Sequence, residues 1–261
     1  MSQFEKLTKQ PLVMVLAEFR FSTVLQIEKY IPQFQDHVRQ KFPHFSTFSQ
    51  QEIVVEPQGL KVNQNDVWLF QSVDKKSAFH LDKDRISFLT ADYNRFPDFL
   101  GQCQTAIEFV ETVIKPALIL RIGLRYSDVI LENTPEEKIE DYVQEAVCNT
   151  SVGNVFDGQI RHSNESILKT EHGVLVVKSL YGYSNITVWQ DLVEVPIAIK
   201  KASTPSKRIL LDFDHYWSSE EQEESQYFNK EFILQKVDGL HENSRKAFWD
   251  ITTDIGREVW K

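Results

Sequence analysis

The sequence predicts an α+β protein in which helices pack on curved antiparallel sheets. Two long stretches of alternating apolar and polar residues, 12–22 and 117–131, each begin a series of shorter strands and amphipathic helices. The order of elements is β-α-β4-α in residues 1–116 and β-α-β3-α in residues 117–261. We therefore expect two similar α+β halves, N-terminal and C-terminal, that share one continuous sheet and core.

The first half begins with a polar stretch, residues 1–10, which we expect to be a loose lead-in. Alternation in the strand that follows places Val13 and Phe19 on its core face, and Glu18 and Arg20 on the other face.

A helix is predicted from the end of this strand to about Lys41, and Pro32 favours a start near Ile31, since proline is tolerated in a first helical turn. Turn residues then separate short alternating stretches, which is typical of an antiparallel meander, and an amphipathic helix over 96–114 ends the half. The four meander strands are expected at Gln51–Pro57, Asp66–Val73, Ser77–Leu81 and Arg85–Thr90.

The second half begins with the most regular strand of the chain. Leu120, Ile122 and Tyr126 are expected on its core face, with Arg121 and Arg125 on the opposite face. The elements expected after it are a helix over 136–147 and a hairpin of 156–170 and 173–184. Residues 186–193 are expected to be a further strand or a continuation of the hairpin's second strand. A strand at 207–217 and a helix over 227–260, broken near Asp238 and Gly239, complete the half.

Both halves carry a similar phrase near the end of an alternating stretch, EFRFS at 18–22 and GLRYS at 123–127. With the matching order of elements, this resembles helix-grip and TATA-binding-protein-like architectures, in which two such halves share a sheet. The likeness is topological and does not extend to DNA binding. The net charge of −9 argues against non-specific nucleic-acid binding, which depends on a basic surface.

Composition and length restrict the location and the chemistry. Two cysteines are too few for a disulfide framework, the first residues do not form a signal-peptide pattern, and no apolar run reaches membrane-spanning length. We therefore expect a cytoplasmic protein without membrane contact. The chain contains no nucleophile elbow, Walker loop or dinucleotide fingerprint, and we expect no cofactor.

Phrases along nearly the whole chain resemble an uncharacterised, sporadically distributed prokaryotic family of about this length with no assigned activity. They are PLVMVLAEFRF, IPQFQDHVRQKFP, VWLFQSVDK, ISFLTADYNRFPDF, LRIGLRYSDVI, LLDFDHYW, and a leucine–histidine pair ahead of a helix that contains Phe-Trp. The scattered distribution of that family implies a role in antiviral defence or a toxin–antitoxin system, and no mechanism.

The candidate binding site is a set of charged residues that alternation places on one face of three strands. They are Glu18, Arg20, Arg121, Arg125, Asp212 and Asp214. One interpretation is a network of cross-strand ion pairs. The other is a pocket in which the guanidinium groups hold a carboxylate, a phosphate or the acidic tail of a partner.

Two functions fit this set. The first is a non-enzymatic protein that binds another protein or a small anionic ligand, with a homodimer as one form of partnership because long strands leave edges to cover. The alternative is a metal-dependent hydrolase or nuclease-like enzyme that uses Glu18, Asp212 and Asp214. The histidines stand at no recognisable ligand spacing, so we expect no metal site built on them.

Overall fold

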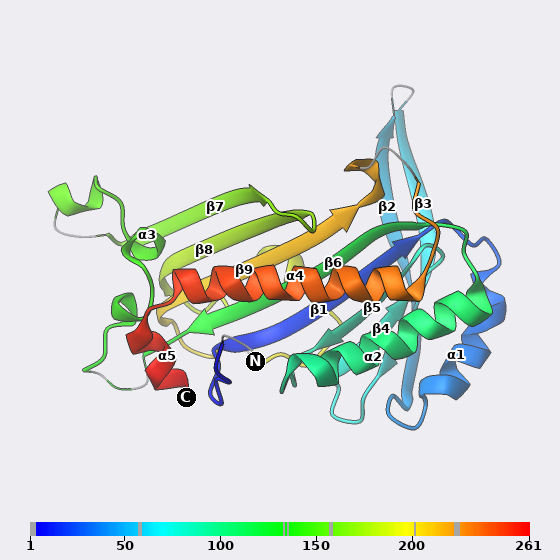
Figure 1. The fold of residues 1–261 in the computed structure, drawn as a ribbon, viewed down its shortest axis with the longest axis horizontal. Helices are drawn as coiled ribbons and strands as arrows, with labels where there is room; N and C mark the ends of the chain where they lie inside the picture. The colour runs from blue at the N-terminus through cyan, green and yellow to red at the C-terminus, as the bar shows by residue number, and fades with distance from the viewer. Residues whose placement is uncertain are drawn as a thin grey trace.

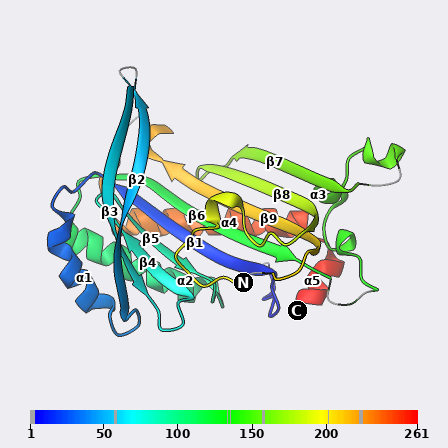
Figure 2. The same cartoon turned by 180° about the vertical axis from the view of Figure 1, so that it is seen from behind.

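The computed structural model describes residues 4–56, 59–132, 134, 136–156, 159–200, 202–221 and 225–261, with backbone only for 50–56 and 59–65. The described residues form nine strands in one antiparallel sheet and five α-helices, so the α+β class is confirmed. Helices lie across one face of the sheet (Figure 1). Figure 2 shows the opposite face, which the α-helices of the described residues leave uncovered.

The strands of the first half follow the predicted meander. β1 (Leu12–Phe21) pairs with β5 (Arg85–Thr90), which pairs with β4 (Ser77–Leu81). β3 (Gly59–Gln71) and β2 (His44–Glu56) complete this side, longer than predicted, and project beyond the rest of the sheet (Figure 1). Pro57, the predicted end of the first meander strand, lies outside the described residues.

The strands of the second half extend the same sheet. β6 (Ile119–Ile130) lies beside β1, followed by β9 (Ser206–Ser218), β8 (Val174–Ser184) and β7 (Arg161–Lys169). The full order is β2-β3-β4-β5-β1-β6-β9-β8-β7. The predicted hairpin is confirmed, and β1 and β6 occupy the centre of the sheet.

The strand predicted at 186–193 is wrong. This segment contains a 3-10 turn, η5 (Gln190–Leu192), and lies over the sheet face that lacks helices (Figure 2). Val188 and Leu192 pack there against Met14 of β1 and Leu89 of β5. Its apolar residues are therefore buried by packing onto the sheet, without strand pairing.

The predicted helix starts are partly confirmed. α1 (Ile31–Val38) begins at Ile31 with proline in its first turn, after the 3-10 turn η1 (Ile27–Tyr30). α2 (Phe96–Phe109) continues as one π-helical turn, η2 (Val110–Ile114), as far as predicted.

The helix predicted over 136–147 is wrong. A 3-10 turn, η3 (Ile139–Tyr142), and the single-turn α3 (Glu145–Cys148) stand in its place. Val143 between them is extended, with φ −131°, and forms a β-bridge with Thr252. This tertiary contact overrides the local helix signal.

The last helix breaks later than predicted. α4 (Lys230–Ile251) runs without interruption through Gly239, and α5 (Asp254–Trp260) follows with Thr253 as its N-cap. A Cβ at Gly239 would lie 2.5 Å from the ring of His172, so the glycine admits that ring and does not end the helix. None of the helices among the described residues is both long enough and apolar enough to span a membrane.

The core lies between the helices and the sheet, and two β-bulges alter the predicted alternation. The register shifts between Leu12 and Met14, and again where Phe21 faces Ile119. As a result Leu12 packs on the helix side and Val13 on the other. Ile119 is fully buried, whereas Leu120, expected in the core, is 37% exposed.

Candidate functional site

The structure brings all six predicted site residues onto the sheet face away from the helices. Glu18 and Arg20 come from β1, Arg121 and Arg125 from β6, and Asp212 and Asp214 from β9. The three strands are neighbours, with Arg20 opposite Arg121 and Arg125 opposite Asp214. We call this set the arginine–carboxylate face.

Glu18 lies at the centre of one half of this face. Its Oε1 accepts from Nε of Arg20 at 2.7 Å and from Nη1 of Arg121 at 3.0 Å, and its Oε2 lies 3.6 Å from Nη1 of Arg85. Burial raises the pKa of Glu18, but Arg20, Arg121 and Arg85 together bring it below its ordinary value. Arg85, which the sequence reading did not include, belongs to the same cluster.

Arg125 lies at the centre of the other half. Its Nε donates to both oxygens of Asp212, at 2.9 and 3.1 Å, and its Nη1 and Nη2 donate to Asp191 at 2.6 and 3.2 Å. Asp212 is fully buried, and burial raises its pKa to about 6 against the opposing effect of Arg125. Asp191 belongs to η5, so the segment mistaken for a strand completes this cluster.

Arg121 joins the two halves of the face. Its Nη2 lies 3.6 Å from Oδ1 of Asp214, and its guanidinium stacks 4.5 Å from the centre of the Tyr216 ring. A Cβ at Gly123 would lie 2.6 Å from Nη1 of Arg121. The glycine therefore makes room for this guanidinium.

Every predicted arginine of this face is paired with a carboxylate of the same protein. This arrangement matches the cross-strand ion-pair interpretation, and the role of the six residues in binding stays a prediction. The same pairing gives the metal-dependent alternative no geometric support, because each carboxylate faces a guanidinium. The described residues also contain no group of three or more His, Cys, Asp or Glu arranged to hold a metal ion.

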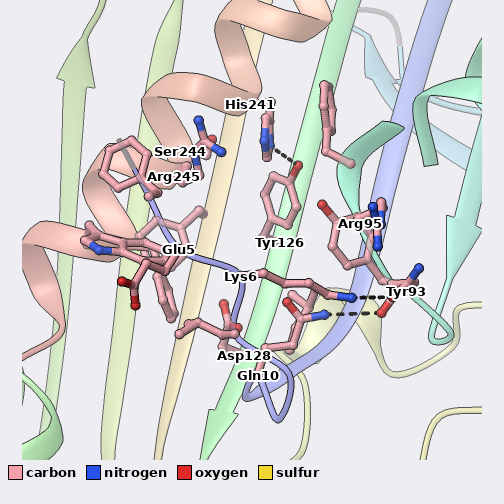
Figure 3. A pocket seen from close by; sticks show the side chains of 18 of the residues that line it. Glu5, Lys6, Gln10, Tyr93, Arg95, Tyr126, Asp128, His241, Ser244 and Arg245 are labelled. Carbon is pink, nitrogen blue, oxygen red and sulfur yellow. Dashed lines mark hydrogen bonds between the residues drawn. The ribbon is translucent and has the colours of Figure 1, made fainter. Parts of the chain in front are cut away.

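A cavity of about 260 Å³ lies on the opposite, helix-covered side of the sheet. Five separate parts of the chain surround it: the N-terminal segment 4–12, residues 93–97, strand β6, strand β9 and helix α4 (Figure 3). Much of its wall is aromatic. These rings belong to Phe4, Tyr93, Phe96, Tyr126, Phe213, Phe248 and Trp249. We call it the α4 cavity.

At one end of the α4 cavity, the ring of His241 is held in place by a hydrogen bond and by stacking on an aromatic ring. The hydroxyl of Tyr126 lies 2.7 Å from Nδ1 of His241, a hydrogen bond visible in Figure 3. The His241 ring stacks on Phe96, with centroids 3.7 Å apart and planes 4° from parallel. Burial and, to a lesser degree, Arg245 lower the pKa of His241 to about 4, so its imidazole is neutral near pH 7.

Asp128 is the most unusual residue of the cavity wall. It is only 4% exposed, and it lies on β6 directly across from Leu12 of β1. In the part of the chain that the structure describes, its carboxyl has no hydrogen-bond or ion-pair partner. Burial, together with the charge of Asp212, raises its pKa to about 8. Its carboxyl is therefore mostly protonated at neutral pH.

Four other charged side chains line the cavity, namely Glu5, Lys6, Arg95 and Arg245. Each has a partner of its own, respectively Lys261 at 2.8 Å, Asn94 at 3.1 Å, Asp98 at 3.9 Å and Glu242 at 2.7 Å. Among the polar atoms of these four side chains, only Nε of Arg245 is buried without a hydrogen-bond partner in the part of the chain that the structure describes. Asp128 thus differs from all of them, because its charge-bearing group as a whole is unpaired.

The sequence reading missed this cavity, and one of its expectations is wrong here. Residues 4–10 are not a loose lead-in. Leu7 is buried, and the backbone N–H of Lys9 donates to the carbonyl of Trp260 at 2.8 Å. A signal for the site was nevertheless present: alternation along β6 places Asp128 on the apolar face, two residues after Tyr126.

Comparison with models of known protein families finds no match, and comparison with curated proteins finds none either.

Proposed function

We propose that this protein is a non-enzymatic binding protein that holds a small organic molecule in the α4 cavity. The unpaired carboxyl of Asp128 carries this proposal. Buried polar groups in proteins are nearly always hydrogen-bonded, and leaving one unpaired costs stability. A buried titratable group with a shifted pKa in a cavity is therefore a candidate for ligand binding.

The shape and the walls of the cavity support the same function. Ligand sites are typically concave and mainly apolar, with a small number of polar groups that orient the ligand. The α4 cavity has aromatic walls, and its lining includes the buried carboxyl of Asp128. Its volume of about 260 Å³ suits a compact molecule.

The arginine–carboxylate face is a weaker candidate for the proposed binding. An anion at this face would have to displace carboxylates that already hold Arg121 and Arg125 at 2.6–3.6 Å. If this face captures an anion or an acidic partner, Arg121→Ala together with Arg125→Ala should abolish the capture while the protein stays folded. Unchanged capture would contradict this second site.

The proposal is tested by filling the cavity with a larger side chain. Leu12→Trp should place an indole ring beside Asp128, whereas Leu25→Trp makes the same change at a position 87% exposed. Ligand-observed NMR with a mixture of small aromatic fragments should detect binding to the wild type and to Leu25→Trp, and should detect none to Leu12→Trp. Equal binding by all three folded proteins would contradict the proposal.

We also propose that the two halves are related as in helix-grip or TATA-binding-protein-like folds. Two pairings support this: β1 pairs with β5, and β6 pairs with β9, so the first strand of each half pairs with the last. Residues 1–116 and 117–261 should each fail to fold when expressed alone, because β1 and β6 share the central core. Independent folding of both halves would contradict one continuous core.

The proposed role in prokaryotic defence or a toxin–antitoxin system is supported by the family resemblance alone. It predicts that the neighbouring genes encode a toxin or a defence effector. Neighbours that belong only to ordinary metabolism would count against it.

A further inference from the structure

We infer that the ligand of the α4 cavity is a small primary or secondary amine, bound as an ammonium ion whose N–H groups donate to the carboxylate of Asp128. This inference rests on the proposed function and specifies the chemical class of its ligand. It depends on three features of the cavity: the unpaired carboxyl, the pairing of the other charges, and the aromatic walls.

The hydrogen-bonding state of Asp128 calls for a donor. An ionised carboxylate only accepts hydrogen bonds, and its two oxygens offer about four sites. No donor among the described residues occupies any of these sites, although the side chain of Asp128 is buried, with only 4% exposure. A ligand that supplies N–H groups would fill these sites with charge-assisted hydrogen bonds, which are the stronger kind.

The other charged groups that face the cavity do not supply this donor. Lys6 donates to Asn94, and Arg245 contacts both oxygens of Glu242 at 2.7 Å. Arg95 is exposed and lies 3.9 Å from Asp98. No cation acts to lower the pKa of Asp128. His241 is neutral, because its pKa is about 4.

The aromatic walls favour a cation over a neutral or negative ligand. The face of an aromatic ring attracts an ammonium group through the quadrupole of the ring. Tyr126 lies on the same face of β6 as Asp128, and Phe213 lies directly across from Tyr126 on β9. An anion would oppose the ionisation of Asp128 and could not donate to its carboxylate, and a quaternary ammonium ion has no N–H to donate.

Binding as an ion pair would release a proton. The carboxyl is mostly protonated at neutral pH, so formation of the carboxylate–ammonium pair sends its proton to solvent while the ammonium keeps all of its own. The affinity for an amine should therefore rise about tenfold per pH unit as pH approaches about 8 from below. The affinity for a neutral ligand should not follow this dependence.

The test measures by isothermal titration calorimetry how tightly the protein binds four probes of similar size. The probes are phenethylamine, phenethyl alcohol, hydrocinnamate and phenethyltrimethylammonium. Phenethylamine should bind most tightly and release about one proton at pH 7, measured in buffers of different ionisation enthalpy. Asp128→Asn, which is nearly isosteric with the protonated acid, should weaken phenethylamine about 10- to 100-fold and change phenethyl alcohol less than about twofold.

The matched control is Asp36→Asn, which removes an exposed carboxylate of α1 that does not line the cavity. Asp36 is paired with Arg39 at 3.3 Å, so this variant should bind phenethylamine within about twofold of the wild type. If the alcohol, the acid or the quaternary ion binds as tightly as the amine, the amine assignment is overturned while the cavity remains a binding site. If none of the four binds at millimolar concentration, both the assignment and the proposed function fail.

Discussion

Buried charged groups are paired on one face of the central strands, whereas the buried carboxyl on the other face is unpaired. On the side without helices, Arg121 and Arg125 are held by carboxylates of the same protein, and the buried Asp212 lies against Arg125. On the helix side, Asp128 is also buried, with 4% exposure, but has no partner among the described residues. A cluster of charges therefore marks a binding site less well than a buried group left unpaired, because a closed network of ion pairs already satisfies its own groups.

The largest effect is expected from breaking the paired side. Arg125→Ala should destabilise the protein by about 3–5 kcal/mol, because it leaves the fully buried Asp212 without its cation. Chemical denaturation at pH 8, where Asp212 is ionised, measures this loss. A loss below about 1 kcal/mol would show that the pair is not structural.

The second largest effect is expected to be a gain in stability, from replacing Asp128. The pKa of Asp128 in the folded protein, about 8, is above its ordinary value of 3.8, so wild-type stability should fall as pH rises from about 4 to about 8. Asp128→Asn removes this penalty, worth about 1.4 kcal/mol per pKa unit, and leaves an unpaired amide that costs about 1–3 kcal/mol.

The expected net result of Asp128→Asn is a gain of about 2–4 kcal/mol near pH 9, shrinking to below about 1 kcal/mol near pH 5. Thermal and chemical unfolding across this range measure it. A variant that is less stable than the wild type at high pH would mean that Asp128 is paired and ionised in the folded protein.

A smaller effect is expected at the fixed end of the cavity. Tyr126→Phe removes the hydroxyl that lies 2.7 Å from Nδ1 of His241, and leaves that buried nitrogen unpaired. The expected loss is about 1–2 kcal/mol in denaturant unfolding. Tyr183→Phe, at an exposed tyrosine, is the matched control and should change stability very little. Equal losses would place the effect outside the cavity.

The smallest effect is expected at the exposed edge of the arginine–carboxylate face. Arg20→Ala removes an ion pair to Glu18 whose arginine side chain is 47% exposed, and Glu18 keeps Arg121 and Arg85. The change in the free energy of unfolding should be within about 0.5 kcal/mol, and half-molar salt should reduce it further. A loss as large as that of Arg125→Ala would contradict the distinction between buried and exposed pairs.

Much of the fold could be predicted because local signals and tertiary packing agree. Alternation identified β1, β6 and β9, turn residues identified the hairpins, and Pro32 marked the start of α1. The failures occur where packing overrides the local pattern. Val143 is drawn into a β-bridge with Thr252, and the apolar residues of 186–193 pack onto the sheet.

The two candidate sites also differ in whether local sequence signals could reveal them. The arginine–carboxylate face was found because its predicted residues alternate along three recognisable strands. The α4 cavity was missed because five segments far apart in the chain meet to form it, and alternation says nothing about their distance in space. Asp128 on an apolar strand face was a local signal, but only the structure shows that its carboxyl lacks a partner.

The most direct test of the binding site is a pH titration of Asp128 monitored by carboxyl-carbon NMR, with and without phenethylamine. We predict a pKa near 8 in the free protein and a marked decrease when the amine binds, because the ammonium stabilises the carboxylate. A pKa near the ordinary value of 3.8, unchanged by the amine, would contradict both the unpaired carboxyl and the proposed site.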